Sequence, residues 1–208
     1  MNYEDLRKQM VEEQLKARGI KNNKVLEVFS EIPRENFVPQ SFKDKAYTDS
    51  PLPIGEQQTI SQPYTTAFMT ELLELNGSET VLELGTGSGY SATILSKLCK
   101  KVFTIEISPL LAIKAREKLK NLNISNVTVI INDGRLGLRD EAPFDAIVVT
   151  AATDKVPNVL IHQLKTGGRL VIPIGNKLSQ KMVKITKTEQ GIKTEECGIF
   201  RFVPLVGR

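Results

Sequence analysis

Histidine, cysteine and tryptophan are scarce in this sequence of 208 residues, which has one histidine, two cysteines and no tryptophan. A single histidine, His162, excludes any reaction or metal site that needs two histidine side chains. Cys99 and Cys197 lie far apart and share no short motif, so neither a disulfide framework nor a zinc site is expected. We therefore predict no bound metal, and a reduced, cytoplasmic setting.

Long apolar runs and charge blocks of one sign are also missing. Uncharged stretches such as residues 146–153 are far shorter than the roughly 20 apolar residues of a membrane span. The first residues, MNYEDLRK, lack the apolar core of a signal peptide. The 28 Lys and Arg are interspersed with 24 Asp and Glu, and the eight Phe and four Tyr form no array. We expect neither a membrane nor a nucleic acid as partner.

The length predicts a single domain over residues 1–208 with a core that needs no disulfide. Residues 1–78 form a helical N-terminal extension in this prediction, and residues 79–208 form an α/β core. In the extension, helices are expected from Tyr3 to Leu15 with Gly19 as cap, at 24–32 and at 62–75. The Pro- and Gly-punctuated segment 47–61 between them is expected to be a loop or a loose hairpin.

Short β-branched runs alternate with helical segments after residue 79. Strands are expected at 81–84, 102–107, 127–131, 146–150 and 169–174, and helices at 90–98, 109–122 and 155–164. This alternation predicts right-handed crossovers and a parallel sheet that is covered on both faces. The last two runs, 181–188 and 198–203, are separated by a turn region and are expected to pair as an antiparallel hairpin.

The segment VLELGTGSGY at residues 81–90 is a buried strand followed by a glycine-rich turn and the start of a helix. Glycines let the backbone turn sharply and approach a ligand, and a helix N-terminus offers free N–H groups. Glu106 ends the next strand, at the spacing from Gly85 where a carboxylate reaches ribose hydroxyls. The sequence therefore predicts a nucleoside-containing ligand at a topological switch point beside Gly85 and Glu106.

Tyr90 stands where the dinucleotide fingerprint requires its third glycine, which disfavours a dehydrogenase. With Glu83 before it, the loop resembles the first motif of S-adenosylmethionine-dependent methyltransferases with a Rossmann-like domain. That resemblance implies a seven-stranded, mostly parallel α/β sandwich. In such enzymes the final strand inserts antiparallel, and here we expect the helical N-terminal additions to form a lid.

The segment PIGEQQTISQPY at residues 53–64 resembles the signature of the protein-L-isoaspartate O-methyltransferases. The resemblance continues through Asp133-Gly134-Arg135 and residues 142–147, 149–152, 164–169 and 202–205. Gln57 and Thr66 depart from it, since many relatives have glycine and some have histidine there. It implies methyl transfer from S-adenosylmethionine, with S-adenosylhomocysteine as product, to the α-carboxylate of isoaspartyl residues in peptides and damaged proteins, followed by closure to a succinimide. We expect a monomer.

The resemblance also implies roles for individual residues. Ser61 is the catalytic residue that it marks. The residues that it assigns to the cofactor are Thr59, Ile60, Glu83, Gly85, Thr86, Gly87, Ser88, Gly89, Glu106, Ile107, Asp133 and Gly134. Those that it assigns to the substrate are Val149, Thr150, Ala151, Ala152 and Val203. Two purely structural interpretations stay open, namely Ser61 as a helix N-cap and Asp133-Gly134 as a turn.

The chemistry agrees with a chain that has one histidine. A carboxylate with a pKa near 4 is ionised at neutral pH and needs no general base to act as a nucleophile. Two other classes remain. A methyltransferase of small molecules or RNA would keep the glycine-rich loop and Glu106 but would not need residues 59–61. A non-enzymatic nucleic-acid-binding module would lose affinity steeply with salt.

Overall fold

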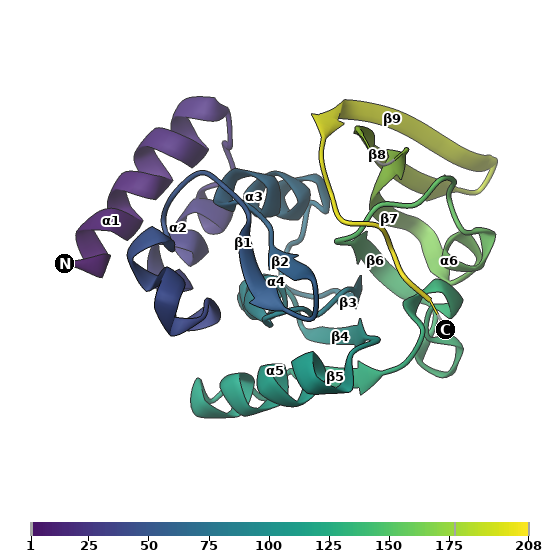
Figure 1. Cartoon of the computed structure of the whole chain (residues 1–208). Coiled ribbons are helices and arrows are strands. Elements are labelled where there is room, and N and C mark those ends of the chain that lie inside the picture. The colour runs from purple at the N-terminus through teal and green to yellow at the C-terminus, as the bar shows by residue number, and fades with distance from the viewer. Residues whose placement is uncertain (1, 177, 208) are drawn as a thin grey trace.

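The structure, a computed structural model, describes residues 2–176 and 178–207. In these residues a seven-stranded sheet, in the order β5-β4-β3-β6-β7-β8-β9, runs through the middle of the molecule (Figure 1). The strands are β3 (Thr80–Leu84), β4 (Lys101–Glu106), β5 (Val127–Ile131), β6 (Phe144–Val149), β7 (Leu164–Gly175), β8 (Gln180–Thr188) and β9 (Gly191–Phe200). Strands β3 to β7 are parallel, and β8 and β9 each pair antiparallel with the preceding strand. The predicted fold class is confirmed.

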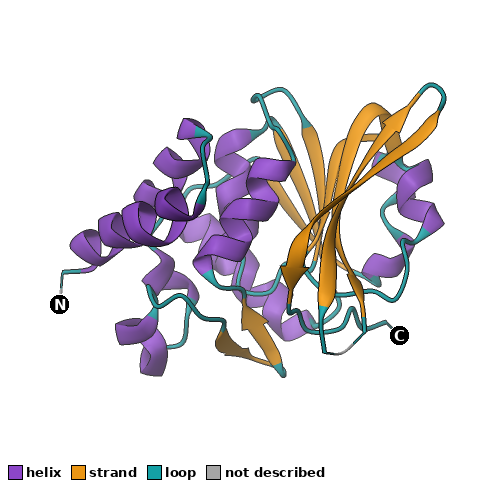
Figure 2. Ribbon diagram, turned by 90° about the horizontal axis from the view of Figure 1, so that it is seen from above, coloured by secondary structure: helices purple, strands orange, loops and turns teal. Residues whose placement is uncertain are grey.

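Helices cover both faces of the sheet because buried strands alternate their apolar side chains between the two faces (Figure 2). Val81 packs with α3 (Pro63–Leu72) and α4 (Tyr90–Leu98) on one face. Leu82 and Leu84 pack with α6 (Asn158–His162) on the other. Helix α5 (Pro109–Asn121) packs against β5 through Leu119 and Val129.

The N-terminal part is helical and packs on the outer side of α4. Helix α1 (Tyr3–Gln9) continues as a π-helical segment, Met10–Leu15, and a 3-10 turn that ends at Gly19 with φ of +98°. After it come α2 (Asn23–Glu31), two 3-10 segments, Arg34–Phe37 and Gln40–Lys45, and a hairpin of β1 (Leu52–Gly55) and β2 (Gln58–Ile60). The segment expected to be a loop or loose hairpin is therefore a hairpin. Among the described residues, no helix is both long and apolar enough to span a membrane.

Several element boundaries differ from the sequence prediction, most clearly those of β9, α6 and β7. Strand β9 begins at Gly191 instead of residue 198 and ends at Phe200, because Thr188 pairs directly with Gly191 across a tight turn. This edge strand is mostly solvent-exposed, so its polar residues gave no apolar signal. Helix α6 covers only Asn158–His162 instead of 155–164, since Pro157 stands extended before it. Strand β7 begins at Leu164 instead of residue 169.

The position of the final strand also differs from what the methyltransferase resemblance implies. Strand β9 lies at the edge of the sheet and is not inserted between earlier strands. Its short connection to β8 places it directly beside β8, whose other side already pairs with β7. The strand order reverses between β3 and β6, so the topological switch point lies beside Gly85, as predicted, with Glu106 one strand further along.

Candidate active site

The glycine-rich turn after β3 is clamped between the neighbouring strands. The hydroxyl of Thr150, which follows β6, donates hydrogen bonds to the carbonyl oxygens of Leu84 (3.0 Å) and Gly85 (2.9 Å). On the other side, the Gly85 N–H donates to the Ile105 carbonyl of β4 at 2.9 Å. Gly85 has φ of +99°, and a Cβ there would lie 2.3 Å from Thr150 Oγ1. Only glycine fits this turn.

Glu106 connects the glycine-rich turn to the start of α5. Its Oε2 accepts a hydrogen bond from the Gly87 N–H (2.8 Å), and its Oε1 accepts one from the Ser108 N–H (2.9 Å). A carboxylate has about four acceptor positions. Two therefore remain for the hydroxyl groups of a ligand at the carboxyl end of β4, where ligands bind in such sheets.

Glu83 lies inside the fold beneath the turn, with no exposed surface. Thr104 donates a 2.6 Å hydrogen bond to Glu83 Oε2, and the Thr86 hydroxyl lies 2.7 Å from that of Thr104. Burial raises the pKa of the Glu83 carboxyl to about 7 because the charged form is poorly solvated there. Glu83 thus supports the turn from below and is not a lining residue of the two cavities described next.

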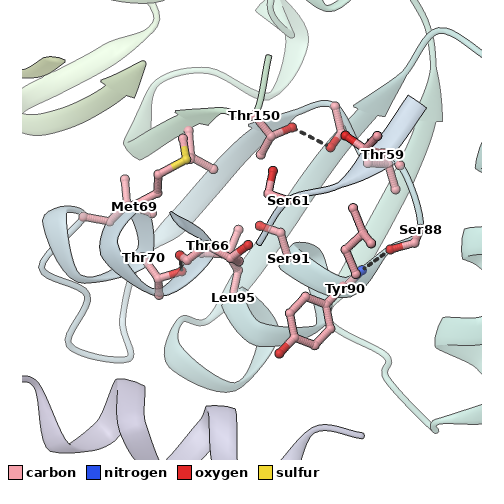
Figure 3. A pocket seen from close by; sticks show the side chains of 16 residues that line it. Thr59, Ser61, Thr66, Met69, Thr70, Ser88, Tyr90, Ser91, Leu95 and Thr150 are labelled. Carbon is pink, nitrogen blue, oxygen red and sulfur yellow. Dashed lines mark hydrogen bonds between the residues drawn. The ribbon is translucent and has the colours of Figure 1, made fainter. Parts of the chain in front are cut away.

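Ser61 lies between β2 and α3 and lines a small pocket of about 50 Å³ (Figure 3). Its side chain lies between those of Thr150 and Ser91 in this view. The N-cap position of α3 is Gln62, which makes no side-chain capping bond. The interpretation of Ser61 as the helix cap is therefore wrong, because the helix begins one residue too late. The other predicted residues that line this pocket are Thr59, Ile60, Gly85, Thr86, Gly87, Ser88 and Thr150.

A groove of about 1020 Å³ adjoins this pocket and shares Thr59, Ser61 and Thr150 with it. One wall is aromatic, where the rings of Tyr64, Phe68 and Phe200 cluster with centroid distances of 5.7 Å (Tyr64–Phe68), 5.4 Å (Phe68–Phe200) and 6.5 Å (Tyr64–Phe200). Of the residues that the sequence assigns to the substrate, Thr150 and Val203 line this groove.

The C-terminal segment is fixed to the loop after β6 by backbone hydrogen bonds. The Val203 carbonyl accepts from the Ala152 N–H (2.8 Å), and the Leu205 N–H donates to the Ala152 carbonyl (2.7 Å). Ala152 and Pro204 form an isolated parallel bridge. In Figure 1 the chain after β9 runs back across the end of the sheet toward the C-terminus. Two predicted substrate residues, distant in sequence, are thus brought together.

The remaining predicted residues lie outside the two cavities. Ile107 and Gly134 follow the ends of β4 and β5, and Gly134 packs closely on Leu84, where a Cβ would be 3.2 Å from Leu84 Cγ. Asp133 forms an ion pair with Arg135 (2.7 Å) and opens a 3-10 turn, so the turn interpretation of Asp133-Gly134 describes the backbone correctly. Three others are buried away from both cavities, namely Gly89 at the N-cap of α4, Ala151 after β6, and Val149 within the core.

Comparison with known proteins identifies the family. The family model for protein-L-isoaspartate(D-aspartate) O-methyltransferase matches residues 5–208. The chain belongs to this family. A protein-L-isoaspartate O-methyltransferase of Geobacter metallireducens is 52% identical over 210 residues, which cover 100% of this chain and 97% of the relative. One of Syntrophobacter fumaroxidans is 50% identical over 208 residues, with the same coverage.

Solved structures of protein-L-isoaspartate O-methyltransferases share the fold. One is 32% identical with a TM-score of 0.87, and the match covers 97% of this chain and 66% of that longer chain. A second, from Plasmodium falciparum and described in complex with S-adenosyl-L-homocysteine, is 26% identical with a TM-score of 0.84. That match covers 97% of this chain and 99% of the other.

Both departures from the family signature are accommodated by the structure, and one of them lies in the site. Gln57 has φ of +57° and Glu56 has φ of +52°, as the two central residues of a tight hairpin turn require. Thr66, where some relatives have histidine, lies on α3 and lines the small pocket. No group of three or more His, Cys, Asp or Glu side chains that could hold a metal occurs in residues 2–176 and 178–207.

Sequence reasoning missed several residues that shape this protein-L-isoaspartate O-methyltransferase site. Ser91 and Thr70 line the pocket, and Arg18 lies over the Tyr64 ring at 3.7 Å from its centroid in the groove. Arg34 donates a 2.7 Å hydrogen bond to the carbonyl of Ser61. No motif marks Arg18 and Arg34, because each makes its contact with a segment that is distant in the chain. Ser91 and Thr70 lie just beyond the segments 81–90 and 53–64, on α4 and α3, so their sequence position was the available signal.

Proposed function

We propose that this chain transfers a methyl group from S-adenosylmethionine to the free α-carboxylate of L-isoaspartyl residues in peptides and proteins, which starts repair through a succinimide. The family match over residues 5–208 supports this activity. The observation that carries it is the position of Ser61, which lines both the pocket beside the glycine-rich turn and the adjoining groove. Methyl donor and peptide would meet at this residue.

The residues present fit S-adenosylmethionine. The turn at Gly85 admits no Cβ, and Glu106 keeps acceptor positions beside Gly87. The 50 Å³ pocket is smaller than a typical ligand site of ~300 Å³ or more, so we place only one end of the ligand in it. Glu106 and Asp133 would hold the rest of the ligand. The residues proposed to hold it are Thr59, Ile60, Gly85, Thr86, Gly87, Ser88, Glu106, Ile107, Asp133 and Gly134, with Glu83 supporting them from below and Gly89 forming the N-cap of α4 behind the turn.

S-adenosylmethionine supplies an electrophilic methyl group on a positively charged sulfur. A substrate carboxylate oxygen attacks that carbon, so that an O–C bond forms as the S–C bond breaks. The negative charge of the carboxylate and the positive charge of the sulfur disappear together, and no proton moves. Because charge is lost in this step, exclusion of water from the site favours it. The chain's part is therefore alignment and desolvation.

Ser61 is the residue that we propose for alignment of the carboxylate. Its side chain does not cap α3, and it projects into the pocket between Thr150 and Ser91 (Figure 3). A hydroxyl there can donate a hydrogen bond to the carboxylate oxygen that does not attack. This bond orients the nucleophile without removing a proton from it.

The adjoining groove is the proposed binding site for the peptide around the isoaspartyl residue. Thr150 and Val203 lie on its wall, and Ala152 holds the Val203 backbone in place. Ala151 is buried and lines neither cavity, so we assign it no contact with the substrate. Val149 is buried among core residues, so we assign it packing and no contact with the substrate.

The deciding experiment uses radiolabelled S-adenosylmethionine and two synthetic peptides that differ only in isoaspartate against aspartate at one site. Base-labile label on the isoaspartyl peptide alone supports the proposal. Equal labelling of both peptides contradicts it, and label found only in added RNA or a small molecule would assign another class of methyltransferase. The monomeric state and the cytoplasmic location expected from the sequence stay predictions.

A further inference from the structure

Arg34 is an unusual residue in this fold because its side chain has no exposed surface and no carboxylate partner among the described residues. Its guanidinium group binds main-chain oxygens instead. Nε donates to the Ala46 carbonyl (2.7 Å), and Nη2 donates to the Ser61 carbonyl (2.7 Å). A buried positive charge is thus held by two carbonyl dipoles.

Such an arrangement is costly for stability. Transfer of a charged group out of water costs several kcal/mol even after relaxation, and carbonyl dipoles repay less of it than a carboxylate would. Burial also lowers the pKa of Arg34, the direction expected for a poorly solvated cation. Apolar residues of similar volume often serve stability as well as buried charges do. Packing alone therefore does not explain an arginine at this position.

The guanidinium group touches both sides of the candidate site. On one side it holds the peptide group of Ser61, which lies between β2 and α3. On the other side its Cζ lies 5.0 Å from the ring centroid of Tyr90, the first residue of α4 after the glycine-rich turn. The Tyr90 ring is itself held edge-on by Phe29 and Phe37. Arg34 thus joins the Ser61 segment to the helix that follows the turn.

We propose that Arg34 is a positioning residue that sets the place of Ser61 relative to the glycine-rich turn. This inference rests on the proposed role of Ser61 in orienting the substrate carboxylate. Residue 61 belongs to neither a strand nor a helix, so the hydrogen bond from Arg34 is what ties its peptide group to the α2–α4 side of the molecule. A shift of ~1 Å at a reacting group costs about a hundredfold in rate.

Two substitutions separate this role from packing. Arg34→Lys keeps the charge, but its single ammonium nitrogen cannot reproduce the two-armed contact with both carbonyls. Arg34→Met keeps much of the volume and has no donor. We expect kcat with saturating isoaspartyl peptide to fall about tenfold to a hundredfold in both variants. The dissociation constant of S-adenosylhomocysteine should stay within about threefold, since Arg34 lines neither cavity.

Arg169→Lys is the matched control. Arg169 also donates to two main-chain carbonyls, those of Leu73 (2.7 Å) and Glu74 (3.0 Å), at the C-terminal end of α3, and unlike Arg34 it also pairs with a carboxylate, that of Glu79 at 3.7 Å. Its substitution should lower the melting temperature and leave kcat within about twofold of the wild-type value. A loss of kcat in this control equal to that in the Arg34 variants would show a general effect of loosened structure and would overturn the proposal.

A double-mutant cycle decides whether Arg34 acts through Ser61. If it does, Arg34→Lys should lower kcat in the wild-type background but by less than twofold in the Ser61→Ala background. Full additivity, or wild-type kcat in folded Arg34→Lys and Arg34→Met proteins, overturns the proposal. Failure of both variants to fold would assign Arg34 to folding and also overturn it. Wild-type kcat in Ser61→Ala alone would instead contradict the proposed function of Ser61, so the two failures are distinguishable.

Discussion

The Thr150 hydroxyl donates a 2.9 Å hydrogen bond to the carbonyl of Gly85, although 65 residues separate them in the chain. The bond crosses the point where the strand order reverses, between β3 and β6. It therefore holds the first residue of the glycine-rich turn in register with the loop that carries the proposed substrate residues.

Gly85→Ala is expected to damage both stability and cofactor binding. A Cβ at residue 85 would lie 2.3 Å from Thr150 Oγ1, and φ of +99° is strained for any L side chain. Gly19→Ala is the matched control, because φ there is +98° and no atom lies within 4 Å of the added Cβ. We expect Gly85→Ala to lose more stability in thermal melts than Gly19→Ala and to weaken S-adenosylhomocysteine binding at least tenfold. Equal losses of stability and unchanged affinity would contradict this account of the turn.

Glu106→Gln is expected to weaken S-adenosylmethionine binding about tenfold or more, since loss of a charged acceptor costs ~1–3 kcal/mol. The substitution should also lower the melting temperature, because the Gly87 and Ser108 N–H groups lose part of their acceptor. Calorimetric titration and thermal melts measure the two effects.

The control for Glu106 is Glu79→Gln. Glu79 is a buried carboxylate that accepts hydrogen bonds from the N–H groups of Asn76 and Gly77, before the start of β3 and away from the site. Its substitution should lower stability and leave affinity unchanged. If both variants bind S-adenosylmethionine like the wild type, the ribose does not lie at Glu106.

Much of this fold was predictable, because buried parallel strands require apolar runs and the glycine-rich turn requires glycines at set positions. The final antiparallel strand was predicted, but its start at Gly191 was not, since an exposed edge strand is free to be polar and residues such as Lys193 and Glu195 carry no strand signal. Arg34 was not predictable either. Its partners are main-chain carbonyls 12 and 27 residues away, and a carbonyl leaves no trace in the identity of its residue.

Glu83 should make stability depend on pH. Burial raises its pKa from an ordinary 4.5 to about 7, so between these values the folded protein keeps a proton that the unfolded chain has lost. The free energy of unfolding therefore falls as the pH rises through this range, by on the order of 3 kcal/mol at most. Glu83→Gln removes this loss. Thermal melts should show the variant gaining stability relative to the wild type as the pH rises from 5 to 8. If the melting temperatures of variant and wild type differ by the same amount at pH 5 and pH 8, Glu83 does not cause the pH dependence.

The most direct test of the account is kcat of Ser61→Ala with a saturating isoaspartyl peptide and saturating S-adenosylmethionine. Because Ser61 does not cap α3, the variant should melt close to the wild-type temperature. If its hydroxyl orients the reacting carboxylate, kcat should fall roughly tenfold to a thousandfold. A Ser61→Ala protein that melts normally and methylates the isoaspartyl peptide at the wild-type rate would show that the reaction does not depend on Ser61.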